Sequence, residues 1–238
     1  MSSTFTWLDA SEHDRRRAME VIDLFRLQTT RDELGIGTVR DALAELLAPG
    51  ISTIQTRARY FLIVPWIYLR LEGQRCSSSE IARRARADEL QIIEALAKSS
   101  DAEGTIGIEA RSSLLRLPST IYWGGLGTLG IRLFAGSQEQ YHRSLDGFYR
   151  IGDRAPSRED REAEFLGHAN WHPHLPSAPR AFLSDLSLAL APEEARYLQD
   201  RFEARTPGSL IACLVASGKP IPDVQFFWDP ALLGRYPS

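Results

Sequence analysis

Cysteine, lysine and long apolar segments are all scarce in this chain of 238 residues. The two cysteines, Cys76 and Cys213, lie far apart without CxxC spacing, so neither a disulfide framework nor a zinc finger is expected. The longest apolar run, residues 60–69, contains a proline and has about half the length that a membrane-spanning helix needs. The N-terminus also lacks the charged-then-apolar pattern of a signal peptide. We therefore expect a cytoplasmic protein that does not enter a membrane.

Arginine supplies 26 of the 28 basic side chains, so lysine is nearly absent. Guanidinium groups form paired hydrogen bonds to phosphate, which would suit nucleic-acid binding. A GC-rich genome also encodes arginine by default, and the abundant alanine favours this explanation. Because the net charge is −3, the surface as a whole does not attract polyanions such as nucleic acids. The arginine excess alone is therefore no evidence for nucleic-acid binding.

The chain does contain an ordinary globular share of apolar residues, 43%, arranged mostly at helical spacing. This pattern predicts a mainly α-helical fold with a helical core. The predicted helices cover residues 11–28, 38–47, 52–73, 79–98, 137–150, 190–205 and 209–217. The helix over 52–73 is apolar nearly all round, so we expect it at the centre of the core, with a kink or break at Pro65.

We expect two regions along the chain. Residues 1–150 would form the helical core, with an Arg-rich segment and an aromatic, glycine-rich middle region whose pattern is compatible with a winged helix. Residues 151–238 would form a linker followed by a helical C-terminal region. The aromatic, proline-rich tail has no closing element, which suggests that the chain continues in nature or docks on a partner.

Two clusters of arginines are candidates for binding nucleic acid or another anion. In the first, Arg31 and Arg40 flank Gly35 and Gly37, where freed amides and a helix N-terminus could hold a phosphate. The alternative is a network of internal salt bridges with nearby acids. Because the lysine and spacing of a P-loop are absent, NTP hydrolysis is not expected.

The second cluster has seven arginines and two glutamates between residues 53 and 86. The arginines are Arg57, Arg59, Arg70, Arg75, Arg83, Arg84 and Arg86. If their guanidinium groups share one outward-facing surface, they form the best nucleic-acid footprint in the chain. The alternative is an ordinary solvated helix face. Tyr122 and Trp123 in the middle region could stack on bases, although aromatic residues beside glycines more commonly pack in a core.

Three histidines, His168, His172 and His174, offer an enzymatic alternative. On a helix the first two would form a metal-binding pair, and a metal-dependent hydrolase or nuclease could use all three with carboxylates just upstream. Pro173 and Pro176 indicate a loop instead, so a His-rich surface loop is the default. No nucleophile motif or paired acid and base is evident, and we assign no cofactor or metal.

Two longer strings carry a family resemblance. TRDELGIGTVRDALAELLAPGISTIQTRARYFLIVPWIYLRLE and RLPSTIYWGGLGTLGIRLFAGSQEQYHRSL resemble the bacterial domain-of-unknown-function family 6361. The resemblance implies a protein often encoded near helicase and phospholipase-D-like genes in phage-defence islands. It supplies no catalytic residues.

Our leading hypothesis is a non-enzymatic component of a bacterial anti-phage defence or DNA-handling assembly. It would bind DNA, or a helicase or phospholipase-D-like nuclease partner, through the Arg-rich segment and the middle region. A further alternative is a scaffold subunit that docks through its aromatic tail, residues 226–228, and touches no nucleic acid.

Overall fold

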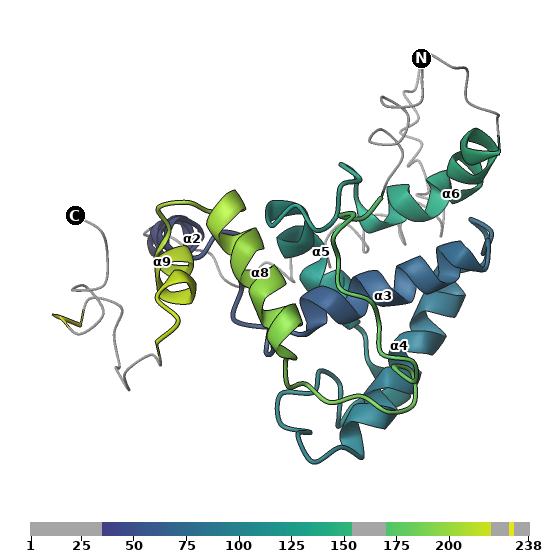
Figure 1. Ribbon diagram of the computed structural model, residues 1–238, viewed down its shortest axis with the longest axis horizontal. Coiled ribbons are helices and arrows are strands. Elements are labelled where there is room, and N and C mark those ends of the chain that lie inside the picture. Colours follow the sequence, from purple (N-terminus) through teal and green to yellow (C-terminus); the bar gives the residue numbers. More distant parts are fainter. Residues whose placement is uncertain (1–34, 154–169, 220–228, 231–238) are drawn as a thin grey trace, which may run out of the picture. The chain divides into compact units, whose positions relative to one another are not determined.

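The computed structural model describes residues 35–153, 170–219 and 229–230 (Figure 1). Within these ranges the chain is helical and has no strand, which confirms the mainly α prediction. The α-helices are α2 (Ile36–Leu47), α3 (Tyr60–Gly73), α4 (Ile81–Ala97), α5 (Pro118–Thr128), α6 (Gln138–Gly152), α8 (Pro192–Arg205) and α9 (Leu210–Ala216), and a 3-10 helix, η1, covers Arg111–Ser113. None of the helices in the described ranges is long and apolar enough to cross a membrane.

The chain divides into two compact units, residues 1–43 and 44–238. Of the first unit, the structure describes the segment from residue 35 onward, which begins α2. The core and the site described below lie within the second unit. The division near residue 150 and the winged-helix arrangement stay predictions.

Helix α3 is the centre of the core, as its sequence predicts. Ten of its side chains are buried, and they point in every direction around the helix. A helix that is apolar on all sides is stable only when other elements cover it. Helices α4 and α5 pack against it, and Phe61 meets Phe202 of α8 edge to face (Figure 1). This arrangement ties α8, which is distant in sequence, to the middle of the molecule.

The beginning of α3 differs from the sequence-based prediction. The helix starts at Tyr60 instead of residue 52, and the residues before it form turns. The Gln55 amide holds these turns in place by donating to the carbonyl oxygens of Gly50 and Ile121, both at 3.3 Å. Pro65 lies inside the helix without ending it. Packing on every side therefore offsets the backbone hydrogen bond that this proline removes.

The N-terminus of α8 is fixed by a carboxylate that serves two partners. Pro192 occupies the first turn, and Glu194 accepts a hydrogen bond from the backbone N–H of Ala191 at 3.0 Å. The same glutamate accepts from Arg59 at 2.7 Å, within the core. These contacts set the position of α8 relative to α3, and hence the position of the residues in its last turns.

The loop that precedes α8 is clamped onto the turn that follows α5. Leu133 N donates to Asn170 O at 2.9 Å, and His172 N donates to Ile131 O at 2.8 Å. Between these contacts, the buried Trp171 donates from its indole N–H to Glu72 at 2.9 Å. The loop then runs across α3 (Figure 1), where Trp66 donates to Pro176 O at 2.7 Å. The result is a fixed backbone on both sides of His172.

Candidate functional site

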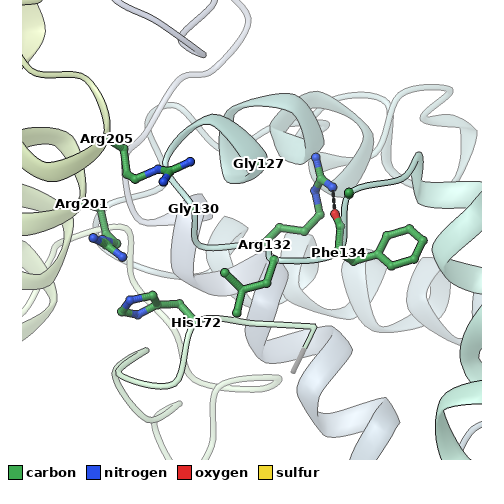
Figure 2. Close-up of a pocket in the computed structure, with 9 residues that line it drawn as sticks. Gly127, Gly130, Arg132, Phe134, His172, Arg201 and Arg205 are labelled. Carbon is green, nitrogen blue, oxygen red and sulfur yellow. Dashed lines mark hydrogen bonds between the residues drawn. The ribbon is translucent and has the colours of Figure 1, made fainter. Parts of the chain in front are cut away.

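A cleft with a volume of about 420 Å³ lies between the last turns of α8, the end of α5 and the His172 loop (Figure 2). Among the residues that the structure describes, its wall contains three arginines and one histidine, and no aspartate or glutamate. The lining residues are Gly127, Gly130, Arg132, Leu133, Phe134, Ala135, His172, Arg201 and Arg205. A concave wall of this composition concentrates positive potential in a protein whose net charge is negative.

Arg201 and Arg205 provide the accessible cations of the cleft. They lie four residues apart on α8, so their side chains emerge from the same face of the helix. Neither forms an ion pair with any residue in the described ranges. The Arg205 side chain passes close to Gly130, whose φ of +62° permits the tight turn after α5. Both guanidinium groups therefore remain available to an anion.

His172 sits beside these arginines with one ring nitrogen unused. Its Nδ1 atom is buried and has no hydrogen-bond partner in the described part of the chain. Burial, the positive charge of Arg201 and the neighbouring His174 all lower the pKa of His172 below its ordinary value, so the ring is neutral near pH 7. Its ring also lies 5.6 Å from that of Tyr197. A neutral imidazole carries one acceptor nitrogen, and here it is enclosed in a cationic site.

Arg132 contributes charge to the cleft, but its N–H groups are committed to the backbone. Its guanidinium donates to the carbonyl oxygens of Phe134, Gly136 and Trp123, and it lies 4.9 Å from the centre of the Trp123 ring. Figure 2 shows this group turned toward Phe134 and away from His172. Burial lowers the pKa of Arg132. We therefore assign it a structural role in closing the turn.

A model of a protein family matches residues 1–231 of the chain. The chain belongs to DUF6361, a family of unknown function. This match confirms the resemblance seen in the sequence. Comparison with curated proteins finds no match, and comparison with solved structures finds none either.

In this DUF6361 chain, the Arg-rich segment is engaged in internal contacts. Arg57 pairs with Asp101 at 3.1 Å and donates to Glu103 O at 2.9 Å. Arg59 is buried against Glu194 and Ser187. The first part of the segment is therefore tied to residues that follow it by 44 positions or more.

The arginines on α3 and α4 and between these helices are engaged in the same way. Arg83 and Arg84 both pair with Glu80, at 3.1 and 3.0 Å, and the remaining pairs are Arg70 with Asp88 and Arg75 with Asp153. Arg86 donates to the carbonyl oxygens of Ser112 and Leu114. The structure thus gives each guanidinium group an internal partner, with Glu80 shared by Arg83 and Arg84, where the hypothesis required one shared outward-facing surface. The assignment of these arginines to nucleic-acid binding stays a prediction, with this geometry against it.

The two aromatic candidates lie in the core. Tyr122 is fully buried and donates to Arg57 O at 2.8 Å. Trp123 is 8% exposed, donates to Gly136 O at 3.1 Å, and has the rings of Tyr141 and Trp171 around it. In this arrangement neither ring is free to stack on a base. Both rings pack in the core, which is the alternative that the neighbouring glycines favoured.

Several other candidates lie partly or wholly outside the described residues. Arg31 lies outside them, and Arg40 pairs with its exposed neighbour Asp41 at 2.8 Å. The rings of His172 and His174 are 5.6 Å apart, and no group of three potential metal ligands occurs in the described ranges. His168 and the aromatic tail, residues 226–228, also lie outside, so the three-histidine site and the docking tail stay predictions.

Sequence reasoning missed Arg201 and Arg205, although a signal was present. The α8 sequence has four acids and three arginines, so its total charge hides any local excess. Helical spacing is more informative, because side chains meet at i±3 and i±4. Neither of these two arginines has an acid at those positions, whereas Arg83 and Arg84 both reach Glu80.

Proposed function

We propose that this protein binds nucleic acid through the phosphate groups, at the cleft formed by Arg201, Arg205 and His172. In this proposal it is a non-enzymatic component of a bacterial anti-phage defence or DNA-handling assembly. It works beside a helicase or phospholipase-D-like nuclease, as the family resemblance implies. The observation that carries the proposal is the pair of guanidinium groups in a concave wall: among the described residues, neither group has an acidic partner and no carboxylate lines the wall.

The chemistry of the two arginines suits phosphate. A guanidinium group presents N–H donors in a planar fork that matches two phosphate oxygens, and two such groups on one helix face can hold one phosphate or two neighbouring ones. Because the cleft is a local feature of a protein with net charge −3, binding should be confined to it and sensitive to salt.

The proposal is tested by measuring DNA affinity against salt concentration for the double variant Arg201→Ala/Arg205→Ala. Fluorescence anisotropy with labelled single-stranded and duplex DNA gives the affinity from about 50 to 200 mM salt. Each phosphate contact that is lost lowers the slope of log affinity against log salt by about 1, so we expect a decrease of about 2. The affinity of the double variant should fall by about 100-fold at the lowest salt.

The matched control is the double variant Arg83→Ala/Arg84→Ala. It removes the same charge from exposed arginines in the segment that the sequence favoured, and both of these are paired with Glu80. We expect its affinity to stay within about twofold of wild type, because weak surface pairs contribute little. The reverse pattern would assign binding to the Arg-rich segment. Absence of wild-type binding at about 50 mM salt would reject the proposal.

A further inference from the structure

Building on the proposed function, we propose that the cleft recognises the terminal phosphate of a nucleic-acid strand in preference to its internal phosphodiesters. Three features of the site support this preference: the number of donors, the unpartnered nitrogen of His172 and the concave shape.

The donors fit a terminal phosphate better than a diester. An internal diester carries one negative charge and two non-bridging oxygens. A terminal phosphate has three such oxygens and a charge of about −1.5 to −2 at pH 7. Arg201 and Arg205 offer two forks of N–H groups, and Arg132 adds a third positive charge nearby while its own donors stay on carbonyl oxygens. This surplus of positive charge is best matched by the more highly charged group.

His172 provides a feature that an internal diester cannot use. Its Nδ1 atom is buried and has no hydrogen-bond partner in the described residues, and in the neutral tautomer with hydrogen on Nε2 it is a hydrogen-bond acceptor that a ligand reaches when the ring turns toward the cleft. A terminal phosphate that retains one proton can donate its P–O–H hydrogen to this atom, whereas a diester has no hydrogen to give. If the proton moves, the O–H bond breaks, an N–H bond forms, and a phosphate dianion faces an imidazolium.

The shape of the site also favours the end of a strand. The volume of about 420 Å³ falls in the range of pockets that enclose a small molecule. Leu133 and Ala135 give part of the wall an apolar surface, on which the sugar or base of one terminal nucleotide can rest. A strand end can enter such a cleft, while a continuous duplex has to pass across its opening.

The test compares three single-stranded oligonucleotides of one sequence, with a 5′-phosphate, with a 3′-phosphate, or with hydroxyl groups at both ends. Anisotropy with the full-length protein measures the affinity for each. We expect one phosphorylated form to bind about tenfold more tightly than the hydroxyl form, because it gains charge-assisted hydrogen bonds. The two phosphorylated arms identify which end is bound.

A pair of histidine variants tests the role of His172. His172→Ala should reduce the preference for the phosphorylated end to about threefold or less while binding of the hydroxyl form persists. His174→Ala is the matched control, because His174 is the exposed neighbour outside the cleft wall, and it should keep the full preference. Full preference in the His172→Ala variant would remove this histidine from the recognition of the terminal phosphate.

A competition experiment on the wild-type protein avoids any effect of substitution on folding. Adenosine 5′-monophosphate, adenosine 3′-monophosphate and adenosine are each added to the complex with the phosphorylated oligonucleotide. We expect the nucleotide with the matching phosphate to displace it and adenosine to have no effect. Equal affinity for all three oligonucleotides would refute this inference while leaving the proposed function intact, whereas no binding of any of them would refute both.

Discussion

The arginines of residues 53–86 and the two arginines at the end of α8 have opposite surroundings. The first group is numerous and each member has an internal partner, most of them carboxylates. Arg201 and Arg205 are only two, yet no acid in the described residues pairs with them and they line a cleft. Whether an arginine is available to bind an anion therefore depends on which acids the fold brings close to it. The number of arginines in a segment does not predict this availability.

The partners of the Arg-rich segment come partly from distant positions that its local sequence does not include. Asp101 and Glu194 reach Arg57 and Arg59 from 44 and 135 positions away. The acidic residues between positions 53 and 86 are Glu72 and Glu80. Glu72 accepts hydrogen bonds from other groups, the hydroxyl of Tyr141 and the indole of Trp171. A local excess of positive charge in a sequence is thus compatible with an internal ion-pair or hydrogen-bond partner for each of these arginines in the folded chain.

The largest effect that this comparison predicts is on stability, at the buried end of the Arg-rich segment. Arg59 and Glu194 have side chains only 8% and 7% exposed. Arg59→Ala leaves the glutamate charged and buried, so the free energy of unfolding should fall by about 3–5 kcal/mol in urea denaturation. A loss below about 1 kcal/mol would contradict the assignment. Arg59→Met/Glu194→Gln should recover part of the loss, because neither residue then carries a buried charge.

Much of the fold could be predicted from the sequence, because its signals are local. The all-round apolar character of α3 indicated its central place. The helix predicted over residues 137–150 corresponds to α6, which begins with a capping box in which Ser137 Oγ accepts from Gln140 N at 3.2 Å. The start of α3 was wrong because Gln55 is held by Ile121, a contact distant in sequence.

The candidate site was less predictable, because it is assembled from three separate segments. His172 drew attention as a potential metal ligand beside His168 and His174. Its position next to Arg201 instead depends on the backbone contact of the loop with Ile131. No pattern within the loop encodes that contact. The lack of acids at helical spacing around Arg201 and Arg205 was the one local signal.

An effect of intermediate size concerns Glu89, a carboxylate that forms no ion pair with any residue that the structure describes. It is 1% exposed and accepts from the backbone N–H and the hydroxyl of Ser119, at 2.8 and 2.7 Å. Arg86, one turn earlier on α4, directs its hydrogen bonds to carbonyl oxygens. Burial raises the pKa of Glu89 from 4.5 to about 7.

The sign of the pH dependence follows from this raised pKa. Between about pH 4.5 and 7 the folded protein holds a proton on Glu89 that the unfolded chain releases, so this residue makes stability fall as pH rises through that window. Glu89→Gln should flatten the profile of unfolding free energy against pH. At pH 8 it should be more stable than wild type by about 2–3 kcal/mol. Parallel wild-type and variant profiles would show that Glu89 titrates normally.

The smallest effect bears most directly on the comparison, because it separates arginines that pair with an acid from arginines that have no acidic partner in the described residues. Like charges at i and i+4 destabilise a helix by about 0.2–0.5 kcal/mol, so Arg201→Gln should raise the free energy of unfolding by this amount. Arg205 lies in the last turn of α8, where its positive charge also interacts favourably with the helix dipole, so Arg205→Gln should have little net effect. Arg84→Gln removes the pair with Glu80 and should lower it by a similar amount. Urea denaturation of all three variants, at low salt and again at about 1 M salt where screening suppresses both effects, measures the difference. If Arg201→Gln destabilises the protein as Arg84→Gln does, Arg201 has a favourable partner of its own, and the distinction between the two regions fails.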